Sequence, residues 1–539
     1  MFTTQRPSKI PARNREFPGF IPTALSKNCL HLNVWTPQAS ETTKLPVLVW
    51  FHGGFFKTGS SFETSYNAAP LAALNDVVVV SCNFRLGMFG FFDANNKGAP
   101  GNVGLWDQAM VMKWVQRNVR AFGGDPELVT LFGESSGSMA IHLHLMSAFS
   151  AGLFRRAFFI SGTESTDADV DSVDESIRTG NAIVEALGCA NPLQNLTSHP
   201  DEVLQCLRNS SASNIAEATE NVTSPSRLAF LPTFNTELVP YLPSVATEKG
   251  LFRVADAMVS VVKNEGAVTF VMQSNKDLLL DNLSGYDWEE FVQDVEALLG
   301  EFVKKSIFPI ALDYLENAQA KEKSAYRQAA ADFVGKNHLY CPSRVFSENY
   351  SARNGKIYGM VFAHRSRKSK LPKWTEVTHR TEIPYFFGIP FLDSVNYDEE
   401  DRQRLSPCGI LDERFLSFLP STCRCNVAVT LLVFPALGSL AARFGGKKKG
   451  EQEPRGRHVI SGMSNVLPRR RLYCAVPELR TSLPSCNRPP IMEEEANLEK
   501  QGRSFVASRQ STFEDVSVVI CSVAKLAIFL LNSAGFYHV

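Results

Sequence analysis

The stretch Gly133-Glu134-Ser135-Ser136-Gly137 decides how this chain folds. It follows the apolar, β-branched run 128–132, and the segment 139–146 that comes next has the apolar spacing of a helix. A strand, a G-x-S-x-G turn and a helix in this order are typical of a nucleophile elbow, which holds a serine hydroxyl above the edge of a sheet. We expect the two glycines to let the backbone turn sharply around Ser135. The sequence therefore predicts a serine nucleophile at the carboxyl end of a strand.

Strand-like apolar runs recur on both sides of this turn and alternate with helical segments. Strands are predicted at 30–35, 47–51, 76–84, 128–132 and 157–160, a helix at 108–120, and further strands at 228–231 and 267–272. The polar segment 165–225 is rich in helical patterns, and we expect it to cap the sheet. Strands that alternate with helices form a mostly parallel sheet with helices on both faces. Together with the elbow, this pattern predicts an α/β-hydrolase fold.

The composition is that of a globular protein with a large core, since 44% of the 539 residues are hydrophobic and 20% are charged. Lysine plus arginine and aspartate plus glutamate each number 55, which gives no reason to expect a nucleic acid or an anionic membrane surface as a partner. The apolar segments 427–442 and 516–531 are interrupted by Pro435 and Lys525, and neither reaches the ~20 clean apolar residues of a spanning helix. The sequence contains no metal-ligand spacing, so we expect no metal and no cofactor.

Cysteines and sequons bear on the cellular compartment. Cys189 and Cys206 flank a short polar segment between two helix-like stretches, which makes them a disulfide candidate in an oxidising compartment, while two free thiols are the alternative in the cytosol. N-x-[ST] sequons begin at Asn195, Asn209, Asn221, Asn282 and Asn349. These features favour a secreted or secretory-pathway protein. Residues 1–20 lack the apolar core of a signal peptide, so we expect the natural N-terminus to lie upstream.

A serine nucleophile needs a base and an acid, which follow it along the chain in this fold. Glu265 comes after the apolar run 259–262 and before a glycine, where a strand would open into a turn. Its position alone favours a solvated turn glutamate. His379 lies on a polar loop before an aromatic segment, and His364 and His338 compete with it for the role of base. A surface histidine is the plain alternative for each of them.

A glycine turn directly after the predicted strand 47–51 is the candidate for an oxyanion hole. It reads His52-Gly53-Gly54-Phe55-Phe56, and its glycines would let backbone amides approach a substrate oxygen closely. The amide of Ser136, which follows the nucleophile, would supply a further donor.

Several longer motifs run in order along residues 17–405. They are Cys29-Leu30-His31-Leu32-Asn33-Val34-Trp35-Thr36-Pro37, Asn83-Phe84-Arg85-Leu86-Gly87-Met88-Phe89-Gly90-Phe91, Gly101-Asn102-Val103-Gly104-Leu105-Trp106-Asp107-Gln108, Phe122-Gly123-Gly124-Asp125-Pro126 and Ser161-Gly162, in addition to the glycine turn and the elbow. With this set the chain resembles the type-B carboxylesterases of the cholinesterase-like superfamily.

The resemblance implies a function and a set of site residues. It implies that a small-molecule carboxylic ester is hydrolysed without a cofactor by the triad Ser135, Glu265 and His379. It implies that the oxyanion-hole donors are the amides of Gly54, Phe55 and Ser136. It also implies a disulfide between Cys189 and Cys206, and it places Cys341 at a cysteine that pairs near the C-terminus in relatives.

The chain departs from the family pattern at several places. The family's first strands are absent, as is a partner for Cys29, and Phe55 stands where the family has a third glycine, so we expect strain in that turn. No tryptophan lies between Phe17 and Cys29, where cholinesterases bind choline, and none follows Ser161-Gly162. These absences argue against a cholinesterase proper. The family's C-terminal helices cannot be recognised after about residue 405.

We therefore expect an esterase domain over 17–405 and a divergent tail over 406–539, with no signal for an oligomeric state. A catalytically silent adhesion or binding relative and a defective, truncated gene product are the alternative hypotheses. Silent relatives of this family usually lack the serine. This chain keeps all three triad positions, which favours the hydrolase.

Overall fold

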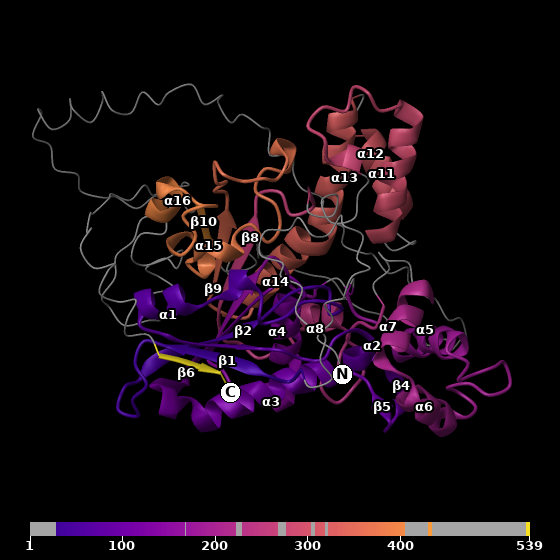
Figure 1. Ribbon diagram of the computed structural model, residues 1–539, viewed down its shortest axis with the longest axis horizontal. Helices are drawn as coiled ribbons and strands as arrows, with labels where there is room; N and C mark the ends of the chain where they lie inside the picture. Colours follow the sequence, from indigo (N-terminus) through magenta and orange to yellow (C-terminus); the bar gives the residue numbers. More distant parts are fainter. Residues whose placement is uncertain are drawn as a thin grey trace, which may run out of the picture. The chain divides into compact units, whose positions relative to one another are not determined.

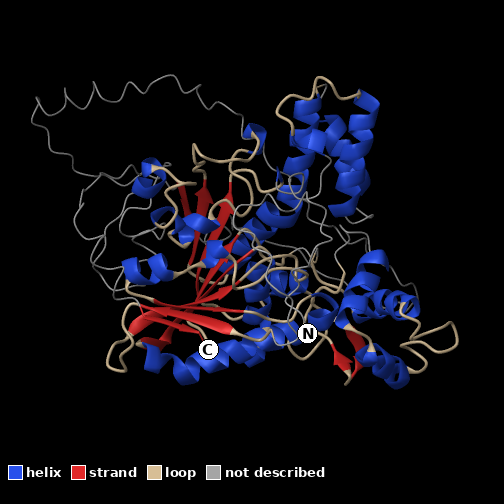
Figure 2. Cartoon of the chain, viewed as in Figure 1, coloured by secondary structure: helices blue, strands red, loops and turns tan. Residues whose placement is uncertain are grey.

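Nine strands of the described residues form one sheet, shown in red in Figure 2. The computed structural model describes residues 29–165, 167, 169–222, 229–267, 276–302, 308–317, 322–404, 430–433 and 535–538. The strands are β1 (Leu32–Thr36), β2 (Leu45–Phe51), β3 (Val78–Cys82), β6 (Gly124–Glu134), β7 (Arg156–Ile160), β8 (Asp256–Val262), β9 (Ile357–Phe362), β10 (Thr430–Val433) and β11 (Gly535–His538). Their order across the sheet is β10-β9-β8-β7-β6-β2-β3-β1-β11.

The centre of this sheet is parallel. The six strands from β9 to β3 pair in parallel, with Leu48 of β2 opposite Thr130 of β6, and the pairs β1–β3, β1–β11 and β9–β10 are antiparallel. In Figure 1 the yellow strand β11 lies beside β1 at one edge. Parallel strands end at the same edge of a sheet, so the loops that follow β2, β6 and β8 meet there. The predicted α/β-hydrolase architecture is confirmed.

Alternate residues of the central strands face two separate apolar cores, because side chains of a strand point to opposite faces. Trp50, Phe132 and Phe158 pack with residues of α1 (Ala69–Asn75) and α15 (Ile383–Phe386). On the opposite face, Val49, Leu131 and Phe159 pack with α3 (Val103–Asn118), α4 (Ser136–Met146) and α14 (Cys341–Ala352). The parallel strands are thus buried on both faces, which explains their nearly continuous apolar sequences.

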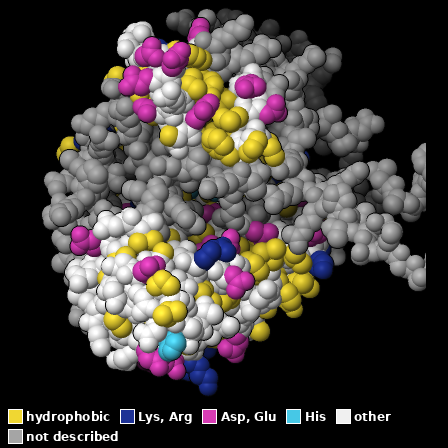
Figure 3. All heavy atoms as spheres, turned by 90° about the vertical axis from the view of Figure 1, so that its right-hand side faces the viewer, with side chains coloured by type: hydrophobic (Ala, Val, Ile, Leu, Met, Phe, Trp, Pro, Cys, Tyr) yellow, Lys and Arg dark blue, Asp and Glu magenta, His cyan; other side chains and the backbone are white. Residues whose placement is uncertain are grey.

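Two further groups of helices stand beside the sheet. The first contains α5 (Val173–Ala186), α6 (Pro200–Asn209) and α7 (Ala212–Val222), which share an apolar cluster with α4 and lie near the hairpin β4 (Asp93–Asn96) and β5 (Ala99–Pro100) in Figure 1. The second contains α11 (Trp288–Phe302), α12 (Phe308–Asn317) and α13 (Lys323–Gly335), which have a cluster of their own. Acidic side chains gather over this second group at the top of Figure 3.

Short helices complete the described chain. They are α2 (Gly87–Phe91), α8 (Pro243–Lys249), α10 (Lys276–Leu279) and α16 (Glu399–Arg404), the 3-10 turns Thr64–Tyr66, Val119–Phe122, Ala148–Ser150, Lys373–Thr375 and Ile389–Phe391, and a π-helical turn at Lys336–Tyr340.

The structure corrects two strand predictions. Of the predicted strand 228–231, residues 229–231 form no strand and residue 228 lies outside the described residues. Of 267–272, Ala267 is helical and the rest lies outside the described residues. The sheet is continued instead by β8 and β9. The sequence analysis missed β9, whose six residues include a glycine and carry little local strand signal.

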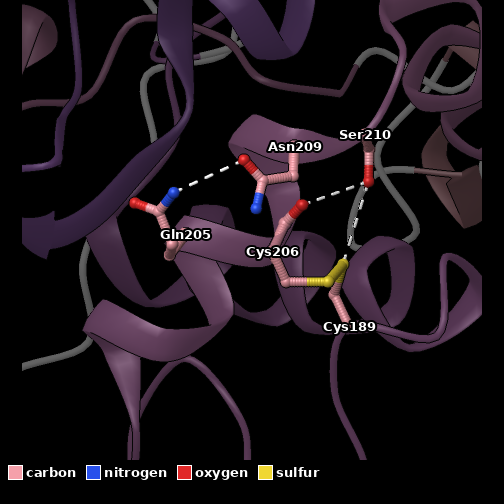
Figure 4. Close-up of a disulfide and its surroundings, with 5 residues drawn as sticks. All are labelled: Cys189, Gln205, Cys206, Asn209 and Ser210. Atoms are coloured by element: carbon pink, nitrogen blue, oxygen red, sulfur yellow. Dashed lines mark hydrogen bonds between the residues drawn. A yellow bond between two sulfur atoms is a disulfide. The ribbon is translucent and has the colours of Figure 1, made fainter.

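The predicted disulfide is confirmed. Cys189 and Cys206 are bonded, with their Cα atoms 5.5 Å apart, and the bond ties the end of α5 to α6 (Figure 4). Ser210 donates a hydrogen bond to the carbonyl of Cys206 beside it. The bond thus fixes a polar loop that has no other covalent tie in the described part of the chain.

The two apolar segments near the C-terminus are described only in part. Residues 430–433 of the first segment form β10, and the segment 516–531 lies outside the described residues. Within the described residues, no helix is long and apolar enough to cross a membrane.

Candidate active site

The elbow places Ser135 between the end of β6 and the start of α4. Its φ of 55° and ψ of −126° are a strained backbone conformation that few residues with a side chain adopt. The amide of Ser135 donates to the carbonyl of Ile160 at 2.9 Å, and its carbonyl accepts from the amide of Met139 at 2.9 Å. The neighbouring strand and the first turn of the helix therefore hold the serine in this conformation.

The elbow glycines are needed for their size rather than for an unusual backbone. Neither Gly133 nor Gly137 has a positive φ, contrary to our expectation that they carry the turn. A Cβ on Gly137 would lie 2.1 Å from the carbonyl oxygen of Phe51, and a Cβ on Gly133 would lie 2.9 Å from the same atom. The sharp turn itself is carried by Ser135. The glycines let α4 pack directly against the end of β2.

Glu265 and His379, predicted as acid and base, meet at this edge of the sheet. Nδ1 of His379 lies 2.8 Å from Oε2 of Glu265, and both side chains are buried. The other oxygen of Glu265 accepts the amide of Val262 at the end of β8. The two loops are joined by a hydrogen bond from the Asn264 amide to the Val377 carbonyl. Because Glu265 is buried and bonded, the alternative of a solvated turn glutamate is wrong.

The competing histidines have other partners. Nε2 of His364 lies 2.8 Å from Oδ1 of Asp401, whose other oxygen accepts the hydroxyl of Ser366. Nδ1 of His338 lies 3.8 Å from Oδ2 of Asp169. His379 is the histidine that the structure places in a hydrogen bond with Glu265, so it is retained as the base candidate.

The second nitrogen of His379 faces the residue before the serine. Nε2 of His379 lies 2.8 Å from Oε1 of Glu134, and within the described residues no hydrogen bond joins Nε2 to Ser135 Oγ. The contact with Glu134 is a close ion pair rather than an aligned hydrogen bond. Burial lowers the pKa of His379, but Glu134 and Glu265 outweigh it and raise that pKa to about 10. The imidazole therefore lies between two carboxylates that favour its protonated form.

The predicted oxyanion turn lies against Glu134 and the elbow. A Cβ on Gly53 would lie 2.4 Å from Oε2 of Glu134 and 3.0 Å from Cβ of Ser135, so this turn must have a glycine there. Gly54 has a φ of 119°, and Phe55 and Phe56 have φ values of 58° and 56°. Left-handed backbone at two consecutive phenylalanines is strained. The strain expected at Phe55 is therefore present.

Two contacts hold this turn in place. The amide of Phe56 donates to Oγ of Ser136 at 3.2 Å, and the carbonyl of Phe56 accepts from the amide of Gly87 at 2.7 Å. The Phe56 ring packs edge-on against Phe91, with ring centroids 5.1 Å apart. Ser136 thus contacts the turn through its hydroxyl, a role that the sequence analysis did not assign.

The sequence analysis missed two other buried carboxylates near His379. Glu382 accepts the hydroxyl of Ser161 at 3.1 Å, and burial together with the charge of Glu265 raises the pKa of Glu382 to about 8. Glu63 forms an ion pair with Arg380 at 2.7 Å. Glu382 lies three residues after the base candidate, a spacing visible in the sequence, whereas no local signal joins residues 63 and 380.

Small-molecule chemistry at this site can use a serine, an imidazole and carboxylates. In the described residues, no group of three or more His, Cys, Asp or Glu side chains is arranged to hold a metal ion. A buried serine on a strained turn, next to a hydrogen-bonded Glu–His pair and a glycine turn, is suited to acyl transfer.

Comparison with known proteins agrees with this chemistry. The sequence profile of the carboxylesterase family matches residues 2–408. Acetylcholinesterase from Bungarus fasciatus is 30% identical to this chain over 412 residues, which span 74% of the chain and 67% of that protein. The region that the family profile matches includes the elbow, the glycine turn, Glu265 and His379.

Proposed function

Because this chain belongs to the carboxylesterase family, we propose that it hydrolyses small-molecule carboxylic esters through an acyl-enzyme on Ser135. Family membership supports ester hydrolysis as the general activity. The observation that carries the proposal for the mechanism is the buried hydrogen bond of 2.8 Å between Glu265 and His379. The same imidazole contacts Glu134 of the elbow, the residue directly before Ser135. The substrate is a neutral or charged ester small enough to reach a buried serine.

In the first half-reaction, Oγ of Ser135 attacks the ester carbonyl and its proton passes to Nε2 of His379. The imidazolium then gives this proton to the departing alcohol, and Glu265 keeps the ring oriented and stabilises its charge. In the second half-reaction, water attacks the acyl-enzyme with His379 again as the base. The bond between the acyl group and Oγ of Ser135 then breaks, His379 returns the proton to Oγ, and the carboxylic acid leaves, with no cofactor in these steps.

The backbone amides of Gly54, Phe55 and Ser136 are the proposed donors to the oxyanion. Their arrangement is supported by the strained turn that lies against the elbow and by the contact between Phe56 and Ser136. Such donors stabilise charge that develops only in the transition state, and loss of one typically costs ~3 kcal/mol.

Glu134 has a part in this cycle. His379 must be neutral at Nε2 to accept the serine proton, and its contact with Glu134 favours the protonated ring. In this proposal the ring must first lose its proton, because an imidazolium between Glu134 and Glu265 cannot accept a proton from Ser135. Nε2 turns toward Ser135 when the ring is neutral.

The cellular setting is proposed from the same features. The disulfide is compatible with the secretory pathway. Among the proposed glycosylation sites, Asn209, Asn221 and Asn282 are exposed, whereas Asn195 and Asn349 are partly buried. The proposed esterase domain spans 17–405, and 406–539 is a tail that adds β10 and β11 to the sheet edges.

Labelling with a fluorophosphonate probe tests the proposed activity. The probe reacts with an activated serine and needs no knowledge of the substrate. An adduct that mass spectrometry maps to Ser135, and that is lost in Ser135→Ala and after heat denaturation, is the expected result. Absence of an adduct on a protein that melts cooperatively would contradict the mechanism and favour a silent binding relative. Absence of a cooperative melt would favour a defective product.

A further inference from the structure

Arg380, directly after the proposed base, has an unusual backbone. Its φ is 74°, in the left-handed region that residues with a Cβ seldom adopt. Its carbonyl accepts the amide of Ile383, and the loop is closed by a bond from the Thr381 amide to the Thr378 carbonyl. Backbone strain of this kind persists only where surrounding contacts hold it, and such positions cluster at functional sites. The contacts of the Arg380 side chain therefore merit a functional explanation.

The side chain of Arg380 reaches the segment that follows the glycine turn. Its Nη2 lies 2.7 Å from Oε2 of Glu63 and 2.9 Å from the hydroxyl of Tyr66. The Glu63 side chain is only 3% exposed and that of Arg380 is 22% exposed. Tyr66 is itself fixed in the core, with its ring 5.1 Å from Trp50 and 5.7 Å from Phe387. The pair joins residues that are 317 positions apart in the chain.

The segment that carries Glu63 is packed on the oxyanion turn. A Cβ on Gly59 would lie 2.5 Å from the carbonyl oxygen of Gly53 and 2.4 Å from Nδ1 of His52. The amide of Glu63 then donates to the carbonyl of Ser60 at 3.4 Å, so the path from the turn to Glu63 is short and ordered by contacts. Movement of Glu63 would therefore be transmitted to the turn.

The charges of the pair also act on the site. Burial lowers the pKa of Arg380, but Tyr66, Glu63 and Glu134 raise it, so the guanidinium stays charged. Burial raises the pKa of Glu63, and the charge of Arg380 opposes this rise. Because Arg380 and Glu134 interact, the guanidinium lies within electrostatic range of the carboxylate that contacts His379.

Buried ion pairs contribute little to stability, since the cost of removing two charges from water offsets much of their attraction. Replacement of such a pair by apolar side chains of similar volume is often neutral or stabilising. Stability alone is therefore a weak explanation for the Arg380–Glu63 ion pair, which also requires Arg380 to adopt a left-handed backbone conformation.

We infer that the Arg380–Glu63 ion pair is a positioning element that fixes the loop of His379 relative to the oxyanion turn. This inference rests on the proposed function, because it concerns the geometry of that reaction. Arg380 acts through its neighbours and does not take part in proton transfer. Without the pair, the base and the oxyanion donors would keep their separate folds but lose their fixed separation.

The double variant Arg380→Met/Glu63→Met tests this role, because it removes both charges and leaves neither one buried alone. We expect it to melt cooperatively near the parent temperature, with kcat and the rate of fluorophosphonate labelling at Ser135 lowered about 10- to 100-fold and KM changed little. The single variant Arg380→Lys, in which Glu63 is unchanged, should keep part of the rate that the double variant loses, because the lysine keeps a positive charge beside Glu63. Arg380→Met alone should also lose stability, because Glu63 is left unpaired.

A buried pair elsewhere provides the control. Arg85 and Asp107 are 2.6 Å apart, with side chains 20% and 8% exposed, and neither belongs to the proposed catalytic residues. Arg85→Met/Asp107→Met should likewise melt cooperatively, and the labelling rate of the folded protein should stay at the parent rate. A folded Arg380→Met/Glu63→Met variant that labels at the parent rate would overturn the inference, as would a loss explained entirely by unfolding. Failure of the parent itself to label would count against the proposed function instead.

Discussion

Nε2 of His379 lies 2.8 Å from Oε1 of Glu134, the residue directly before the elbow serine. Nδ1 of the same ring lies 2.8 Å from Glu265. The imidazole is therefore held from both sides by carboxylates in a site from which water is largely excluded. Such surroundings favour the imidazolium strongly, because an opposite charge at this distance acts with little screening. This relationship makes the protonation of His379 the main variable of the site.

Glu134→Gln should shift the pH dependence of esterase activity. The variant removes a charge and keeps the shape of the side chain, so the pKa of His379 should fall toward its ordinary value of 6.5. The acidic limb of the kcat/KM profile should then move down by about one pH unit or more. Profiles of the parent and of Glu134→Gln with a short-chain ester provide the measurement. Glu348→Gln, on an exposed side chain of α14, is the control, and an unshifted acidic limb in Glu134→Gln would refute the role given to Glu134.

Stability should decrease as the pH rises from weakly acidic to alkaline. The pKa of His379 is raised from 6.5 to about 10, so its stabilising contribution is complete below pH 6.5 and is lost as the pH rises through about 10. The pKa of Glu382 is raised from 4.5 to about 8, so ionisation of the unfolded chain removes stability between these two values. His379 and Glu382 therefore both lower the free energy of unfolding as the pH rises.

Glu382→Gln separates these two contributions. The amide oxygen can still accept the Ser161 hydroxyl, but the group no longer ionises. Urea midpoints between about pH 5 and pH 8 should fall less steeply in Glu382→Gln than in the parent, and the decrease toward pH 10 should persist. Equal slopes in both proteins would show that Glu382 is ionised in the folded state at all these pH values.

Ser136→Ala should impair catalysis more than folding. It removes the acceptor of the Phe56 amide and leaves the proposed oxyanion amide of residue 136 in place. Loss of one buried hydrogen bond costs about 1 kcal/mol of stability. A displaced oxyanion turn should lower kcat about tenfold or more with KM nearly constant. Steady-state kinetics and thermal melts test this, with Ser210→Ala beside the disulfide as control, and a parent-like kcat would contradict it.

Removal of the disulfide should destabilise the protein without abolishing the chemistry. Cys189 and Cys206 close a short loop with a sequence separation of 17, for which loop-closure entropy predicts a loss of about 3 kcal/mol. Cys189→Ser/Cys206→Ser should therefore melt at a lower temperature, and the parent should behave alike after reduction. Labelling of Ser135 in the folded variant should continue at the parent rate. An unchanged melting temperature would indicate that the loop is ordered without the bond.

The elbow could be predicted because its signals are local. The residues of β6, the G-x-S-x-G turn and α4 follow one another directly, and each carries a strong pattern of its own. The same holds for β2, whose apolar run reflects burial on both faces. Strand β9 was missed because its short sequence carries little local strand signal. It is extended in the structure because it pairs with β8. The strands β2 and β6 were predicted because their local sequence patterns are strong, and β9 was missed because its pattern is not.

Glu265 and His379 show where local reasoning is insufficient. Position alone favoured a solvated turn for Glu265, and only the resemblance to a family singled it out. In the structure it is buried against His379, which lies 114 residues away along the chain. A carboxylate's burial depends on what the rest of the chain places over it, so no short segment can reveal it.

The order of residues was enough to predict the strand–turn–helix around Ser135, the parallel α/β sheet and the family, because these depend on local periodicity, motif order and spacing. It offered Cys189 and Cys206 as a disulfide candidate, and the structure joins them. Tertiary structure alone decided that Glu134 contacts the base, that Ser135 rather than its glycines carries the turn, and that Arg380 pairs with Glu63 across 317 positions. These features arise where loops from different strands converge at one sheet edge. Their energies depend on distance and burial in space, which the order of residues does not encode locally.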